Sequence, residues 1–212
     1  MGWGDGETVS VLLSHAMASD EPAGKVLDAT LACVARWGIA KTTLEDIARE
    51  SGVSRATIYR TFAGGKGALL NALVVRESMR FAAAVDEAAA AAATLEDLLV
   101  AGVTTTTRYL AGHDAFQFLL AHEPDTVLPQ FAFQKLELVL RQAAAIAEPH
   151  LARFLPADAV PRAAEWVTRI VLSHLLNPAD HVDLTDEAST RRFVRQLVLP
   201  ALEPTPVSPT RS

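Results

Sequence analysis

Along most of the chain, apolar residues recur at spacings of three and four, which is the period of an amphipathic helix. Residues 22–37 follow this pattern, and Gly38 then predicts the end of the first strong helix. The next segment, TTLEDIARESG, predicts a second helix that is capped by Thr42 or Thr43 and ended by Gly52. Its capping-box partner is the acidic residue at position 45 or 46.

The third predicted helix follows the second after a very short connection. Only residues 52–53 separate the second helix from Ser54, which caps a helix over 54–62. The tripeptide 63–65 breaks that helix because it contains two glycines. A long fourth helix is predicted from Lys66 through the alanine run at 88–93, since alanine has the highest helix propensity.

The rest of the chain also shows helical spacing, and prolines mark its connections. Further helices are predicted at 95–111, 114–122, 131–147, 161–176 and 186–202. Residues 9–17 form either a short docked helix or a frayed arm, and the Pro-rich tail after residue 203 is expected to be disordered. No strand pattern of period two is found, so the sequence predicts an all-α protein with about nine helices.

Two helices joined by such a tight Gly-containing turn form a helix-turn-helix, whose second helix enters the major groove of DNA. Arg55 and Arg60 can then meet guanine edges or phosphates, and Tyr59 can offer its ring and hydroxyl to the DNA backbone. Thr57 and Thr61 can bond a phosphate or contact a thymine methyl group. The apolar residues of the same helix face its supporting helices; they are Val53, Ile58 and Phe62.

A phosphate site is predicted at the start of the fourth helix. Lys66 follows two glycines, so free backbone N–H groups, the positive end of the helix dipole and an ammonium group converge there. The capping threonines Thr42 and Thr43 offer a second such point.

Charge and composition limit the other possibilities. Residues 21–80 hold nine Lys and Arg against six Asp and Glu, so the remainder of a chain of net charge −6 carries −9. This asymmetry suggests two parts with different partners. The single cysteine, Cys33, permits no intrachain disulfide, and neither a transmembrane segment nor a basic secretory start is present. We therefore expect a cytoplasmic protein without a membrane partner.

Residues 25–73 resemble the DNA-binding domain of TetR-family transcriptional regulators. The matching residues are Val26-Leu27-Asp28-Ala29, Trp37-Gly38, Thr42-Thr43-Leu44-Glu45-Asp46-Ile47-Ala48, Ser51-Gly52-Val53-Ser54, Thr57-Ile58-Tyr59, Phe62 and Lys66. The resemblance implies that eight residues face DNA: Thr43, Arg55, Ala56, Thr57, Tyr59, Arg60, Thr61 and Lys66. Gly67 departs from the acidic residue usual in the family, and Gly64-Gly65 replaces a polar pair; both could loosen the start of the fourth helix.

The resemblance also implies a domain order and a mode of action. An arm at 1–20 and a helix-turn-helix domain at 21–67 would precede a ligand-binding and dimerisation domain at 68–203, with a tail at 204–212. The protein would be a homodimer that represses from a palindromic double-stranded operator and is released by a small-molecule effector, here a hydrophobic one. The last two helices would form the dimer surface through Trp166, Ile170, Leu175, Phe193 and Leu197, unless these residues are monomer core.

Candidate effector-pocket residues are the aromatic and aliphatic side chains of the middle helices, which can equally be plain core. They are Phe81, Tyr109, Phe116, Phe118, Leu119, Phe131 and Phe133. His113, His122 and His174 could orient a polar group on the effector, or be satisfied or surface histidines.

Two alternatives remain beside the regulator. One is a helical binding protein for a lipophilic ligand with a vestigial helix-turn-helix. The other is an enzyme, suggested by the pairs His113-Asp114 and His122-Glu123. Adjacent residues point to different helix faces and no metalloprotease-type spacing occurs, so we expect no catalytic residues, no metal and no cofactor.

Overall fold

The computed structural model describes residues 22–131 and 133–202. The predicted N-terminal arm and the predicted disordered tail lie outside these ranges. Within them the chain is helical and contains no strand, which confirms the all-α prediction. No helix in these two ranges is long and apolar enough to cross a membrane.

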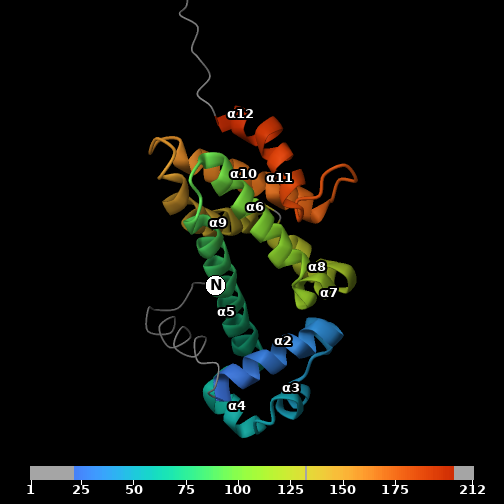
Figure 1. The fold of residues 1–212 in the computed structure, drawn as a ribbon. Coiled ribbons are helices and arrows are strands. Elements are labelled where there is room, and N and C mark those ends of the chain that lie inside the picture. The colour runs from blue at the N-terminus through green and yellow to red at the C-terminus, as the bar shows by residue number, and fades with distance from the viewer. Residues whose placement is uncertain (1–21, 132, 203–212) are drawn as a thin grey trace, which may run out of the picture. The chain divides into compact units, whose positions relative to one another are not determined.

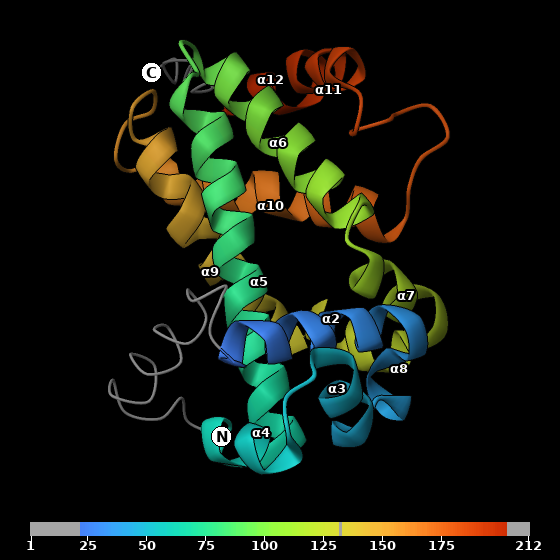
Figure 2. The same ribbon diagram turned by 60° about the horizontal axis from the view of Figure 1, so that its bottom comes forward.

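The described chain forms two compact units (Figures 1 and 2). The first unit takes in residues 22–83 and 110–131, and the second takes in 84–109 and 133–202. The chain therefore passes between the units three times. The first passage lies within one continuous helix, α5, which spans Gly65–Ala90.

In the first unit, three helices and the start of α5 surround one apolar core, and a second group of short helices completes the unit. The elements are α2 Pro22–Lys41, α3 Leu44–Ser51, α4 Arg55–Thr61, α7 Asp114–His122, α8 Pro124–Val127 and the 3₁₀ turn η1 Leu128–Phe131. Leu27, Ile47, Ile58, Phe62 and Leu69 are buried together in the core. Helix α2 contacts α3, α4 and α7, so it is the central element of this unit.

The second unit packs the end of α5 and most of α6 against the C-terminal helices. These elements are α6 Leu95–Ala111, α9 Phe133–Leu151, α10 Val160–Leu176, α11 Glu187–Phe193, the π-turn η2 Val194–Val198 and α12 Leu199–Leu202. Val100, Val103, Ala163, Phe193 and Val194 are among its buried residues. The C-terminal helices thus share one apolar core with the middle of the chain.

The prediction that the alanine run is helical throughout is wrong. Helix α5 ends at Ala90, and residues 91–93 form a turn and an irregular link. The guanidinium of Arg153 donates to the carbonyl oxygens of Ala89 and Ala92 at 3.1 and 2.7 Å. These bonds satisfy carbonyls at a helix end, so a tertiary interaction overrides the propensity of alanine.

Two other boundaries also differ from prediction. Helix α9 continues past Pro149 to Leu151, because a proline near the end of a helix removes only one backbone hydrogen bond. The predicted single helix over 186–202 is instead divided by the π-turn η2. This turn ends two residues before Pro200, whose ring would meet the carbonyl four residues earlier in a regular helix.

Candidate nucleic-acid interface

Helix α3 begins with a complete capping box. The Thr43 hydroxyl accepts from the backbone N–H of Asp46 at 3.2 Å, and the Asp46 carboxylate accepts from the Thr43 N–H at 3.1 Å. Asp46 is therefore the acidic partner and Thr43 the cap, which resolves the two alternatives of the sequence. Thr42 is buried, and its hydroxyl donates to the Gly38 carbonyl at 2.6 Å. It is thus not available as a second surface point for a phosphate.

Helix α4 is tightly fixed at its start and along its inner face. Gly52, with φ of 69°, ends α3 in the left-handed conformation. The Ser54 hydroxyl then accepts from the Thr57 N–H at 3.2 Å and caps α4. Ile58 and Phe62 are buried against the core of the first unit. These contacts give a helix-turn-helix with the connection length that the sequence predicts.

The outer face of α4 carries most of the predicted DNA-facing residues. Arg55, Ala56, Tyr59 and Arg60 are exposed, whereas Thr57 and Thr61 are half-buried. The Arg55 guanidinium lies 3.6 Å from the carboxylate of Glu45, and both side chains are exposed. Such a pair contributes little stability, so Arg55 can leave it at small cost. One helix therefore presents two guanidinium groups and a phenol on its solvent side.

Lys66 lies in the first turn of α5, after two glycines with positive φ of 113° and 66°. The helix begins at Gly65, one residue before the predicted start, and continues through Gly67. The Lys66 ammonium is half-buried and donates to the carbonyl oxygen of Ile39 at 2.5 Å. An ammonium has three donors, so this bond leaves others for a phosphate.

Glu123 is a residue of this unit whose structural role sequence reasoning missed. It lies between α7 and α8, and its carboxylate accepts from the backbone N–H groups of Ile39 and Ala40 at 3.2 and 3.1 Å. The sequence suggests Glu123 only as a partner of His122 in acid–base or metal chemistry. No local pattern could reveal the contact, since it joins positions 84 residues apart in the chain.

A cluster of charges joins α2, α5 and α7 within the first unit. Arg76 is buried and donates to Asp28 at 2.7 Å and to Glu77 at 3.0 Å. Burial raises the pKa of Glu77, but the hydrogen bond with His113 and the charges of Arg76 and Arg80 outweigh burial and lower it overall. Glu77 therefore remains a carboxylate that holds α7 against α5.

The three histidines considered for effector binding have structural partners. Nδ1 of His113 accepts from the Phe116 N–H at 3.2 Å and caps α7. His122 stacks on Phe118, and His174 meets the ring of Phe193 edge-on. Across the described residues, no group of three or more His, Cys, Asp or Glu side chains is arranged to hold a metal ion.

The predicted effector-pocket residues are divided between the two units. Phe81, Phe116, Phe118 and Leu119 belong to the first unit and are half-buried there. Tyr109 belongs to the second unit, and the side chains of Phe131 and Phe133 lie outside the described residues. Their role as a pocket remains a prediction.

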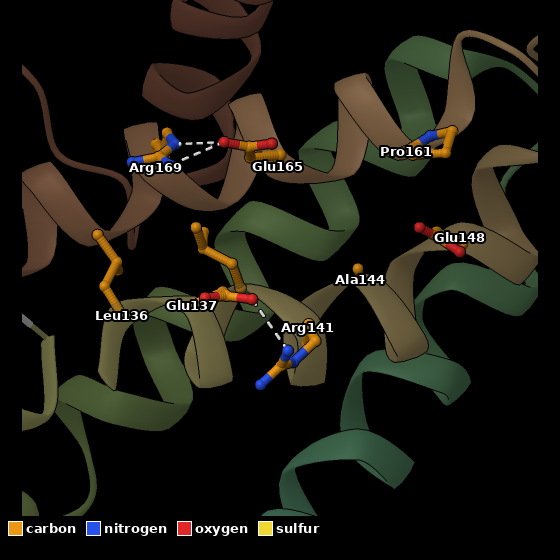
Figure 3. A pocket seen from close by; sticks show the side chains of 9 residues that line it. Leu136, Glu137, Arg141, Ala144, Glu148, Pro161, Glu165 and Arg169 are labelled. Atoms are coloured by element: carbon orange, nitrogen blue, oxygen red, sulfur yellow. Dashed lines mark hydrogen bonds and ion pairs between the residues drawn. The ribbon is translucent and has the colours of Figure 1, made fainter. Parts of the chain in front are cut away.

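A groove of about 350 Å³ lies in the second unit between α9 and α10, and none of the predicted pocket residues lines it. Its lining includes Leu140 and Ala144. Figure 3 shows its charges paired within each helix: Arg141 with Glu137 at 2.9 Å, and Arg169 with Glu165 at 2.7 Å. Glu148 adds a third carboxylate to the lining, which differs from that of the predicted effector site.

The predicted dimer residues fall into three classes of exposure. Trp166 and Leu197 are large, exposed apolar side chains, and Ile170 and Leu175 are half-buried. Phe193 is instead only 6% exposed within one chain and packs against His174, so it belongs to the core of the second unit. Leu176 is a further exposed leucine at the end of α10, which the sequence did not single out.

Comparison with known proteins identifies the helix-turn-helix. The family model described as "Bacterial regulatory proteins, tetR family" matches residues 26–73, which is the segment from α2 to the first turns of α5. The HTH-type transcriptional regulator Rv1255c of Mycobacterium tuberculosis is 28% identical over 184 residues, which are 86% of each chain. Residues 26–73 thus match the tetR family of regulatory proteins, and most of the chain is similar to an HTH-type transcriptional regulator.

Solved structures of TetR regulators share the fold beyond the helix-turn-helix. The TetR family repressor AlkX from a Dietzia species has a TM-score of 0.60 and 23% identity, covering 87% of this chain and 97% of that one. SmeT, the repressor of a multidrug efflux pump of Stenotrophomonas maltophilia, has a TM-score of 0.56 and 20% identity, covering 92% and 96%. At these identities the likeness shows the TetR fold alone.

Proposed function

We propose that the protein is a repressor that binds a palindromic operator as a homodimer and releases it when a small effector binds. The observation that carries this proposal is the construction of α4. Its inner residues Ile58 and Phe62 are buried, while Arg55, Tyr59 and Arg60 are exposed on its other side. A recognition helix needs both features, because a rigid inner face fixes the position of the side chains that meet the major groove.

The same construction argues against a vestigial helix-turn-helix. The Thr43–Asp46 capping box, the left-handed Gly52 and the Ser54 cap are all formed. Each of these capping interactions stabilises an end of α3 or α4 and contributes little to a binding site elsewhere in the chain. Their retention favours DNA binding over a protein that only carries a lipophilic molecule.

The proposed DNA contacts are the eight residues named from the sequence, with roles adjusted to their surroundings. Arg55 and Arg60 would meet base edges or phosphates, and Tyr59 and Lys66 would contact phosphates. Thr43, Ala56, Thr57 and Thr61 would lie against the DNA backbone or base methyl groups. Thr43 is already engaged in its cap, so we assign it a contact through its methyl group or backbone rather than through its hydroxyl.

We infer a hydrophobic effector for this repressor. Phe81, Phe116, Phe118 and Leu119 are half-buried in the first unit, which supports an apolar environment. Two proteins of similar fold are described as implicated in biodegradation of n-alkanes and as a regulator of fatty acid degradation. Addition of n-alkanes or fatty acids of increasing chain length to the operator complex should release DNA at some length. A complex unaffected by every apolar compound would contradict this class.

The function itself is tested by selecting bound fragments from a random DNA pool and measuring their affinity over a range of salt concentrations. We expect an inverted repeat whose half-sites are related by two-fold symmetry, because a dimer of recognition helices reads a palindrome. Affinity should fall steeply with salt, as phosphate contacts require. Binding without sequence preference would reject the repressor and favour the lipophilic-carrier alternative.

A further inference from the structure

One peptide group of the first unit is held on both sides by opposite charges. The carbonyl oxygen of Ile39 accepts from the Lys66 ammonium at 2.5 Å, and the N–H of the following residue, Ala40, donates to the Glu123 carboxylate at 3.1 Å. These two atoms belong to the same peptide unit. Because the C=O and N–H of a trans peptide point in opposite directions, the carboxylate and the ammonium face each other through it.

The chain is shaped locally to expose this peptide. Gly38 interrupts α2 with φ of 78° and ψ of 175°, which turns the backbone N–H groups after it out of the helical direction. A side chain at Gly38 would displace the Glu123 carboxylate, since a Cβ there would lie 2.0 Å from its Oε1 atom. The Gly38 carbonyl is itself bound by the Thr42 hydroxyl at 2.6 Å. The bend is therefore fixed by contacts on both sides of Gly38.

Glu123 is equally fixed on its own side. It ends α7, where its N–H donates to the Leu119 carbonyl at 2.9 Å, and it begins α8, where its carbonyl accepts from the Thr126 N–H at 2.9 Å. Its carboxylate makes three contacts of 3.1–3.4 Å with the N–H groups of Ile39 and Ala40. Figure 2 shows α7 and α8 beside α2, which agrees with the contact between α2 and α7.

We propose that Glu123 is a positioning residue for the DNA contact of Lys66. Its carboxylate accepts from the Ala40 N–H and so polarises the Ile39 carbonyl, which then holds the Lys66 ammonium more strongly. Lys66 is thereby fixed at the start of α5 with its remaining donors directed away from Ile39. The segment between α7 and α8 thus sets the geometry of a side chain of the helix-turn-helix unit, although it contributes no DNA contact itself.

This inference rests on the proposed function, because it assumes that Lys66 meets an operator phosphate. It also predicts a change in operator affinity that is opposite in sign to the change expected from net charge alone. Glu123→Gln makes the protein less negative, and a less negative protein should bind DNA more tightly. If Glu123 positions Lys66, the same change should instead weaken operator binding. Glu123→Asp keeps the charge but shortens the side chain, and it should weaken binding as well.

The matched control is Asp125→Asn. Asp125 is exposed in α8, two residues from Glu123, and takes no part in the contact with Ile39 and Ala40. Its substitution removes the same charge from nearly the same place. We expect operator affinity of this variant to be unchanged or slightly higher, whereas Glu123→Gln should lose about tenfold, the effect of one charge-assisted hydrogen bond.

The decisive measurement is a double-mutant cycle on operator affinity, with the salt dependence of each variant. Lys66→Ala and Glu123→Gln should each lower the slope of log K against log salt concentration by about 0.9 for each phosphate that the protein no longer neutralises. In the Lys66→Ala background, Glu123→Gln should have no further effect beyond about twofold. Circular dichroism at the assay temperature establishes that each variant is folded.

The outcomes separate the inference from the function on which it rests. If Lys66→Ala binds the operator as the unchanged protein does, the assigned DNA contact of Lys66 is wrong. If Lys66→Ala weakens binding but Glu123→Gln adds an independent loss in that background, Glu123 has only a structural role and the inference fails. It also fails if Glu123→Gln and Asp125→Asn behave alike.

Discussion

Arg55 is the side chain of α4 whose present partner is easiest to exchange. It begins the helix, and its guanidinium lies 3.6 Å from Glu45 with both side chains open to solvent. An exposed ion pair at this distance is screened by water and salt and contributes little to stability. A bidentate bond to a guanine edge is stronger, so Arg55 should leave Glu45 when the helix enters the major groove.

We therefore predict that Arg55→Ala relaxes the preference at one base position of the operator and costs about 1–3 kcal/mol of binding free energy. Selection of bound DNA fragments with the variant measures both effects. Arg36→Ala is the control, because Arg36 is an exposed arginine of the same unit that pairs with Glu50 away from α4. Uniform weakening on all sequences would make Arg55 a phosphate contact instead.

At single positions, sequence reasoning found the residues but not always their partners. Thr43 could be chosen as a cap from its spacing to Asp46, yet only packing decides that Thr42 points inward to Gly38. Lys66 could be assigned to a helix start from the glycines before it. Its bond to Ile39 joins residues 27 positions apart and depends on the bend at Gly38, and such a tertiary contact leaves no periodic signal.

At the scale of elements, the start of α3 should respond to acid. The hydrogen bond from the Thr43 hydroxyl lowers the pKa of Asp46 below its ordinary value of 3.8, with further lowering from Arg49. A carboxyl group with a depressed pKa stabilises the fold above the ordinary pKa and loses that contribution as the pH falls through its pKa in the folded state. The capping box is thus intact at neutral pH and weakens only in acid.

The matching prediction concerns Asp46→Asn, which keeps the shape of the side chain and removes its charge. The free energy of unfolding of this variant should lie below that of the unchanged protein at neutral pH. The difference should shrink as the pH falls from 3.8 through the lower pKa of the folded state, because Asp46 becomes neutral first in the unfolded and then in the folded form of the unchanged protein. Urea unfolding at a series of pH values measures this difference in unfolding free energy. A difference that stays constant down to a pH of about 2 would refute the role of the Asp46 charge in the capping box.

Two glycines of the first unit should respond in opposite ways to alanine. At Gly38 a Cβ would be placed in a backbone region with φ of 78° and 2.0 Å from Glu123, so Gly38→Ala should cost about 2–4 kcal/mol of unfolding free energy. Gly67 is helical, and a Cβ added there would meet nothing within 4 Å, so Gly67→Ala should stabilise by up to about 1 kcal/mol. Chemical denaturation compares both, and equal effects would contradict this account.

The existence of the helices could be predicted from the sequence far better than their ends. Periodicity predicted each long helix, because one apolar stripe must face a core wherever the helix packs. The end of α5 at Ala90 depends instead on the contact of one side chain. The guanidinium of Arg153, which binds the carbonyls at the end of α5, lies more than sixty residues away in the chain.

At the scale of the molecule, the two units follow contacts rather than chain order. The family resemblance implied a boundary near residue 67. In the described structure, residues 110–131 join the N-terminal segment through α2 and α7, so the DNA-binding part of the chain carries its own set of later helices. Composition could not predict that α7 and α8 pack with the N-terminal segment, because these two helices have no pattern that distinguishes them from other short helices.

The second unit exposes large apolar side chains on a few neighbouring elements of its sequence. A cluster of such side chains is unusual on the surface of a monomeric protein. Trp166 and Leu176 of α10 and Leu197 of the π-turn are 37–58% exposed. The π-turn contributes to this exposure, because Val194 and Val198 are buried while Leu197 between them faces outward. A second copy of the chain would cover such side chains, as a two-fold dimer requires.

We therefore predict that Leu197→Glu and Trp166→Glu each dissociate the proposed dimer. Either change places two like charges at a two-fold interface, one from each copy, and should raise the dimer dissociation constant at least about a hundredfold. Val74→Glu is the control, since Val74 is a similarly exposed apolar residue of α5 outside the proposed surface. Sedimentation equilibrium measures the mass of each variant. Gel shifts on a single half-site establish whether a monomer still binds DNA through α4. A Leu197→Glu protein that stays dimeric would move the interface away from the C-terminal helices, and a Val74→Glu protein that dissociates would move it to α5.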